Sequence, residues 1–149
     1  MAFYSTPWLS CDPRQEQYRS ALRHLLHNDA TTAAVMLTGL AENGYAPAQF
    51  RLGLLYRLGM GVPVGPRQAV YWFDKAARQG DLGAQYHLAE AYRRGDGAPQ
   101  SLERALQGFR ALAEQGYAPA QYQVALAYEQ GRGVSRSAEA AVDWFQIMD

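Results

Sequence analysis

The heptapeptide GYAPAQF at residues 44–50 returns almost unchanged as GYAPAQY at residues 116–122, and a weaker copy, GDLGAQY, lies midway at residues 80–86. The three copies follow one another at a constant step of 36 residues. Other positions keep the same step: Ala48, Ala84 and Ala120; Tyr56, Tyr92 and Tyr128; Gly59, Gly95 and Gly131; Gly61, Gly97 and Gly133. A fixed period of about 20–50 residues is typical of a stacked array, in which each unit buries its apolar face on the next.

Each unit is predicted to hold two helices. The first spans residues 47–58 and begins with Pro47, which suits the start of a helix because its missing N–H would have had no intrahelical partner there. The glycine triplets GMG, GDG and GRG end the first helices, since glycine readily adopts the left-handed conformation of a C-cap. The second helix carries one apolar stripe at positions i, i+3, i+4, i+7 and i+8, namely Ala69, Trp72, Phe73, Ala76 and Ala77.

The pattern therefore predicts an all-α protein, a right-handed α/α superhelix of about three 36-residue helix-turn-helix repeats with an N-terminal capping helix. We assign residues 1–11 to an N-terminal arm, 12–28 to the capping helix and 30–149 to the repeats, so that 12–149 form a single domain. Asp12 followed by Pro13 indicates the start of the capping helix. Its inward face is expected to carry Tyr18, Leu22, Leu25 and Leu26.

The consensus A-x-x-x-L-G-x-x-Y-x-x-G-x-G-V, followed by A-x-x-W-F-x-x-A-A-x-x-G, resembles the Sel-1-like repeat, a relative of the tetratricopeptide repeat. Residues 48–80 carry the pattern almost completely, and the resemblance covers about residues 30–149. The next unit departs from it at Ala89, Ala98 and Gly108, the last of which replaces a tryptophan. The resemblance implies a superhelical scaffold for protein interactions, often in bacterial signalling and assembly.

Composition excludes several other functions. The 14 basic and 14 acidic side chains cancel, so no overall charge draws the chain to nucleic acid or to an anionic membrane. No segment approaches the roughly 20 apolar residues of a membrane span, and the N-terminus lacks the pattern of a signal peptide. The single cysteine, Cys11, forms no internal disulfide. We therefore expect a soluble, cytoplasmic protein.

No catalytic, cofactor or metal site is predicted. His24, His27 and Asp29 supply at most three corners of a metal site, and none of the strong Cys/His spacings accompanies them. Cys11 has no evident base to activate it. The glycine triplets lack the Lys-Ser/Thr pair that completes a phosphate loop, and the repeat register already explains them.

The positions at which the repeats differ are the best candidates for a binding site. In the first helices, residues without a packing role are expected to line the concave face side by side and to hold an extended or helical peptide. The predicted partner-binding residues are Phe50, Arg51, Leu54, Arg57, Tyr86, His87, Glu90, Arg93, Arg94, Tyr122, Gln123, Leu126 and Gln130. For the aromatic ladder of Phe50, Tyr86 and Tyr122, packing between repeats and contact with a partner are both open.

Two further departures have alternative interpretations. Gly108 leaves a gap that either a neighbouring side chain fills or a partner occupies. The last helix ends with Trp144, Phe145 and Ile147 and no later repeat to cover them. This end either folds onto the preceding unit or provides a surface for self-association or for a partner.

The sequence thus predicts a non-catalytic adaptor or scaffold that binds a protein or peptide on its concave face. Two alternatives remain open at this point. One is an immunity or inhibitor protein directed at a single toxin or enzyme. The other is a hydrolase built on the same scaffold, which would require a cluster of perturbed ionisable groups in a pocket.

Overall fold

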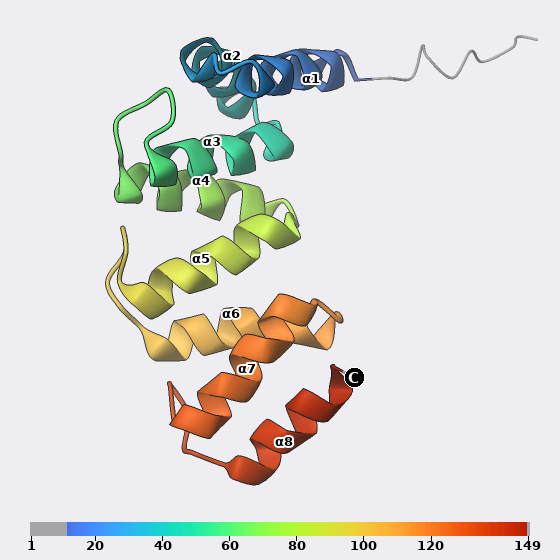
Figure 1. The fold of residues 1–149 in the computed structure, drawn as a ribbon, viewed down its shortest axis with the longest axis vertical. Coiled ribbons are helices and arrows are strands. Elements are labelled where there is room, and N and C mark those ends of the chain that lie inside the picture. Colours follow the sequence, from blue (N-terminus) through green and yellow to red (C-terminus); the bar gives the residue numbers. More distant parts are fainter. Residues whose placement is uncertain (1–11, 149) are drawn as a thin grey trace, which may run out of the picture.

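The computed structural model describes residues 12–148, which form eight α-helices. The predicted arm, residues 1–11, and Asp149 lie outside the described residues. The helices stack one after another along the long axis of the molecule (Figure 1). Their bounds are α1 Pro13–Leu26, α2 Ala30–Glu42, α3 Ala46–Leu58, α4 Pro66–Arg78, α5 Leu82–Arg94, α6 Leu102–Glu114, α7 Ala118–Gln130 and α8 Ala138–Ile147.

Each helix packs mainly on its neighbours in the sequence, as expected for a solenoid. The helices α1, α3, α5 and α7 are the first helices of successive pairs, and α2, α4, α6 and α8 are the second. Within the described residues no strand occurs. The predicted all-α superhelix of helix-turn-helix repeats is therefore confirmed.

The opening heptapeptide joins one repeat to the next. Just after α2, α4 and α6 the chain passes through a glycine with positive φ: 83° at Gly44, 94° at Gly80 and 86° at Gly116. Gln49 then donates a side-chain hydrogen bond of 3.1 Å to the carbonyl of Ala41, in the last turn of the preceding helix. The end of a helix leaves such carbonyls without an intrahelical donor. The Gly44 N–H also donates to the Ala41 carbonyl, at 3.0 Å. The motif therefore turns the chain and ties the next first helix to the end of the preceding helix.

The two glycines of each triplet have different roles. Gly59, Gly95 and Gly131 are left-handed C-caps with φ near 70°, as predicted. The second glycine of each triplet allows a close approach of backbone to backbone. A Cβ at Gly133 would lie 2.5 Å from the carbonyl oxygen of Leu102, at the start of the preceding second helix.

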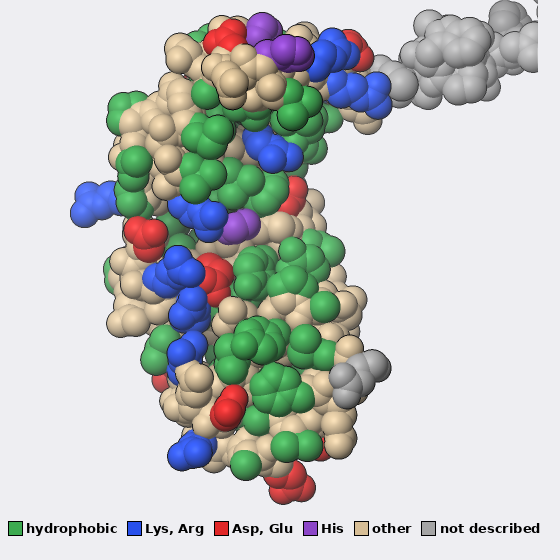
Figure 2. All heavy atoms as spheres, viewed as in Figure 1, with side chains coloured by type: hydrophobic (Ala, Val, Ile, Leu, Met, Phe, Trp, Pro, Cys, Tyr) green, Lys and Arg blue, Asp and Glu red, His purple; other side chains and the backbone are tan. Residues whose placement is uncertain are grey.

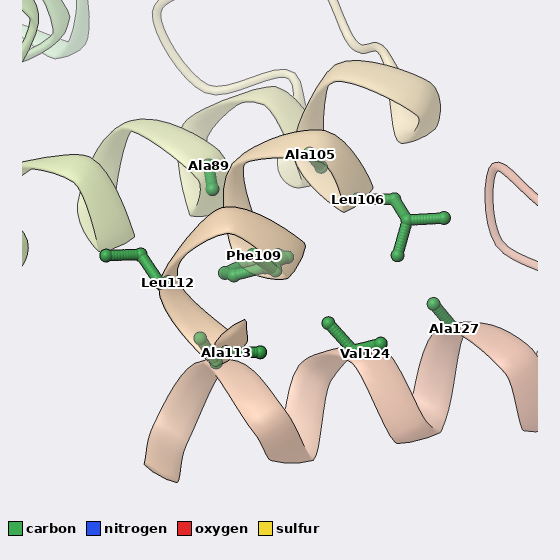
Figure 3. Close-up of a cluster of buried hydrophobic side chains, with 9 residues drawn as sticks. Ala89, Ala105, Leu106, Phe109, Leu112, Ala113, Val124 and Ala127 are labelled. Atoms are coloured by element: carbon green, nitrogen blue, oxygen red, sulfur yellow. The ribbon is translucent and has the colours of Figure 1, made fainter. Parts of the chain in front are cut away.

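Three clusters of buried side chains form the core along the stack. Figure 3 shows one of them, in which Phe109 of α6 lies between Ala89 of α5 and Val124 of α7. Phe73 has the equivalent place on α4, and only 2% of it is exposed. The core is rich in alanine because consecutive helices lie close together at these positions.

The structure corrects one expectation about the ends of the stack. Leu26 does not face inward: 81% of it is exposed. The inward side of α1 instead carries Ala21, which is fully buried, with Tyr18 and Leu25 packed against the same cluster. At the other end, Trp144 packs against the last core cluster and Phe145 is half-buried, whereas Ile147 remains exposed.

Candidate functional site

The predicted binding residues lie on the first helices α3, α5 and α7. We call the surface that they share the first-helix face. Figure 2 shows basic side chains gathered beside a run of hydrophobic side chains on the face that is in view, between α3 and α7. The predicted residues differ widely in their burial and in the contacts that they make with other residues of the chain.

Glu90 is the centre of an ion-pair network on α5. Arg93 donates two hydrogen bonds to its carboxylate, at 3.1 and 2.9 Å, and Arg94 lies 3.3 Å from the same group. Only 12% of the Glu90 side chain is exposed. Two guanidinium groups therefore neutralise one nearly buried carboxylate, and the network keeps a net positive charge.

His87 connects α3 to α5. Its ring stacks on Phe73 with centroids 5.2 Å apart and an angle of 17° between the planes. Burial, followed by the nearby positive charge of Arg57, lowers the pKa of His87 below its ordinary value. A neutral ring can accept a hydrogen bond, and Arg57 Nη1 lies 3.1 Å from His87 Nδ1.

The aromatic ladder packs within the repeats. Phe50 contacts Phe73 with ring centroids 6.0 Å apart, and Tyr86 contacts Phe109 at 5.4 Å. Both first-helix rings are half-buried, so each has a packing role. Tyr122 differs, since 46% of it is exposed, although its ring lies 6.2 Å from that of Phe145.

The remaining predicted residues occupy intermediate environments. Arg51 is half-buried, and its Nε atom has no hydrogen-bond partner among the described residues. Gln123 Nε2 lies 3.5 Å from the hydroxyl of Tyr86 and links α7 to α5. Leu54 and Leu126 are half-buried, and Gln130 is exposed.

Two small pockets open where a repeat meets the first helix of the next one. The first is lined by Arg57, Pro66, Ala69, Val70, Phe73, His87, Glu90, Ala91, Arg94 and Asp96. The second is lined by Arg93, Leu102, Ala105, Leu106, Phe109, Gln123, Ala127 and Arg132. Every residue of the second pocket lies 36 positions after a residue of the first, so the two pockets are equivalent sites in successive repeats.

The pockets include residues that the sequence analysis did not select. Asp96 and Arg132 are the middle residues of two glycine triplets, and their side chains reach the pockets from the turns after α5 and α7. Both residues lie outside the helices, to which the predicted binding residues are confined. The 36-residue register would have found both residues, because Asp96 and Arg132 are equivalent and opposite in charge.

Gly108 lines an apolar groove on α5 and α6 together with Gln85, Leu88, Ala89, Tyr92, Arg104 and Ala111. Leu88 is half-buried, whereas its equivalents Leu52 and Val124 are fully buried. In their repeats a tryptophan packs against the same cluster. The missing indole thus leaves a groove, and no neighbour fills it.

The two histidines near the C-terminal end of α1 have ordinary local roles. His24 Nδ1 lies 3.2 Å from the carboxylate of Asp29, and His27 Nδ1 lies 2.7 Å from the carbonyl of Arg23. Within residues 12–148, no three His, Cys, Asp or Glu side chains form a group able to hold a metal ion. None of the eight helices has the length and apolar character needed to cross a membrane.

The architecture defines the chain as an α/α solenoid with a polar, variable first-helix face. The family model described as Sel1 repeat matches it in three places, at residues 46–81, 83–117 and 118–148. The chain therefore belongs to the Sel1 repeat family. Proteins of this family are generally scaffolds for protein–protein interaction.

Two solved structures resemble the chain. A Sel1 repeat protein from Oxalobacter formigenes is 30% identical, with a TM-score of 0.83 over 91% of this chain. A protective antigen of uropathogenic Escherichia coli strains, which displays the same fold, is 29% identical, with a TM-score of 0.86 over 91% of this chain. The match covers 58% of the first relative and 30% of the second. The chain therefore spans only part of the length of either protein.

Proposed function

We propose that the protein is a non-catalytic adaptor that binds a segment of another protein on its first-helix face, the surface expected to be concave. The observation that carries the proposal is the pair of equivalent pockets along that face. Because the pockets recur at the repeat interval, a single extended segment that follows the stack meets the same kind of site twice.

The composition of the face supports binding. Its arginines and half-buried aromatic rings are residue types that anchor protein interfaces. The side chains that reach the pockets differ between repeats, as Asp96 and Arg132 do, so the face is able to select among sequences. The aromatic ladder contributes through Tyr122, the most exposed of its three rings.

Site-specific photo-crosslinking in cells that produce the chain tests the proposal. A photoreactive phenylalanine analogue replaces Leu58, which lies at the end of α3 on the first-helix face and is 57% exposed. The matched control places it at Tyr71, which lies on α4 and is 53% exposed. We expect a discrete adduct from position 58 and none from position 71.

Each other outcome has a definite meaning. Adducts from position 71 alone place the binding surface on the second helices and refute the proposal. An adduct with a second copy of the chain makes the protein a self-associating scaffold. An adduct with a toxin or enzyme, together with inhibition of that protein, identifies an inhibitor. Turnover of generic ester or amide substrates by the purified chain would contradict the non-catalytic assignment.

A further inference from the structure

We infer that the partner segment is acidic: an extended stretch in which small apolar side chains alternate with carboxylates. This inference rests on the proposed function and specifies the chemistry of its partner. The small apolar side chains enter the two pockets, and the carboxylates pair with the arginines at the rims.

The apolar residues that line the pockets determine which apolar side chains of the partner segment fit there. The buried Phe73 and Ala69 line the first pocket, and the likewise buried Phe109 and Ala105 line the second. The free space amounts to about 30 Å³ in the first pocket and about 10 Å³ in the second. Cavities of this size have no room for a bulky group, so a small side chain such as alanine or valine fits them better than an aromatic ring.

The arginines at the rims of the pockets determine the charge of the partner segment. Four arginines line the two pockets, against the carboxylates of Glu90 and Asp96. Glu90 is already bound by Arg93 and Arg94. Opposite charges on the two partners would therefore steer an acidic segment onto the face and fix its register.

Two of the four arginines have no carboxylate partner inside the described chain. Arg57 is bonded to His87, a neutral acceptor, and has no carboxylate within 4.0 Å among residues 12–148. The same holds for Arg132 at the second pocket. These two guanidinium groups line successive pockets and are available to carboxylates of a partner, with which arginine forms paired hydrogen bonds.

Asp96 distinguishes the two pockets. It occupies in the first pocket the place that Arg132 occupies in the second. The second pocket therefore lacks any lining carboxylate and is the more positive of the two. We expect it to take the more acidic end of the segment.

Fluorescence anisotropy with two labelled peptides tests the inference. The acidic peptide is (Glu-Val-Glu-Pro)3, which the prolines keep extended, and the charge-inverted peptide is (Lys-Val-Lys-Pro)3. At low salt we expect the acidic peptide to bind at least about tenfold more tightly than the basic one. This preference should weaken as added salt screens the charges.

Charge variants then locate the site. Arg57→Glu and Arg132→Glu should each weaken binding of the acidic peptide about tenfold. Lys75→Glu, which makes the same change in net charge on the exposed side of α4, should alter it less than twofold. Asp96→Asn removes the carboxylate from the first pocket and should tighten binding about two- to threefold. Circular dichroism verifies that each variant is folded.

Equal binding of the two peptides, or no binding of the acidic one, would overturn the inference. So would a loss with Lys75→Glu as large as with Arg57→Glu, since binding would then follow net charge alone. The proposed function is tested by a separate experiment, the crosslinking at position 58. A crosslink at position 58 combined with a failed peptide assay leaves the adaptor in place with a partner of different chemistry.

Discussion

Replacing Gly53 by alanine should destabilise the protein, although alanine favours a helix. Gly53 lies within α3, and a Cβ built there would be 2.6 Å from Cε1 and 2.7 Å from Cδ1 of Phe73. Non-bonded carbon atoms prefer a separation of about 3.5–4.0 Å, so the phenyl ring would have to move by about 1 Å. Phe73 has little room to move, because it is 2% exposed and lies against the rings of Phe50 and His87.

The magnitude follows from two opposing effects. Overpacking a core costs about 1–3 kcal/mol, whereas exchanging glycine for alanine inside a helix contributes about 1 kcal/mol of stability. Because two ring atoms overlap the new methyl, we expect the upper part of the first range. The net loss for Gly53→Ala is then about 2 kcal/mol.

Gly39→Ala is the matched control. Gly39 lies within α2, is exposed, and a Cβ there would meet nothing within 4 Å. This change should raise stability by about 0.5–1 kcal/mol through helix propensity alone. Urea unfolding followed by circular dichroism measures both variants. If Gly53→Ala proves as stable as Gly39→Ala, α3 and α4 are not as closely packed as described and the reasoning is refuted.

Three more predictions concern the pH dependence, the turns and the repeat junction. In the folded protein the pKa of His87 is lowered from 6.5 by burial and by Arg57, so the unfolded chain binds the proton more readily. Thermal scans should show stability falling as the pH drops below 6.5, and His87→Gln should reduce that slope. Gly97→Ala should cost more than Gly80→Ala in urea titrations: both glycines have positive φ, but only at Gly97 would a Cβ meet the backbone of an earlier helix. Equal losses would contradict this. Gln49→Met should lower stability by about 0.5–1.5 kcal/mol, because it removes the side-chain hydrogen bond to the Ala41 carbonyl, which keeps its bond from the Gly44 N–H; an unchanged melting temperature would contradict this.

The repeat made the helices predictable. The helix predicted for residues 47–58 is α3, Ala46–Leu58, and its counterparts α5 and α7 begin 36 and 72 residues later, because the repeat register fixes the turns and the apolar stripes fix the buried faces. The ends were less predictable. Leu26 lies five positions after Ala21, so at about 3.6 residues per turn their side chains point to different sides of α1, and only the packing of the helix shows that Ala21 is the buried one.

The candidate site was predictable in part. Variation between repeats selected Arg57, His87 and Glu90, which line the first pocket. The variation between repeats did not reveal that Glu90 forms ion pairs with Arg93 and Arg94, because ion pairing depends on rotamers that a sequence does not specify. For that reason Arg57, bonded only to a neutral ring, is a better target for charge reversal than Arg93.

By itself, the sequence determined the architecture: the helices, their turns and their stacking order follow from local rules repeated at a fixed period. Only the tertiary structure decided which polar side chains remain available to a partner. Helix formation depends on residues a few positions apart, whereas the pockets form between side chains of three different helices, such as Arg57, Phe73 and His87. Packing across the repeats sets the distances between these side chains, and so decides which of their hydrogen-bonding groups stay unpaired.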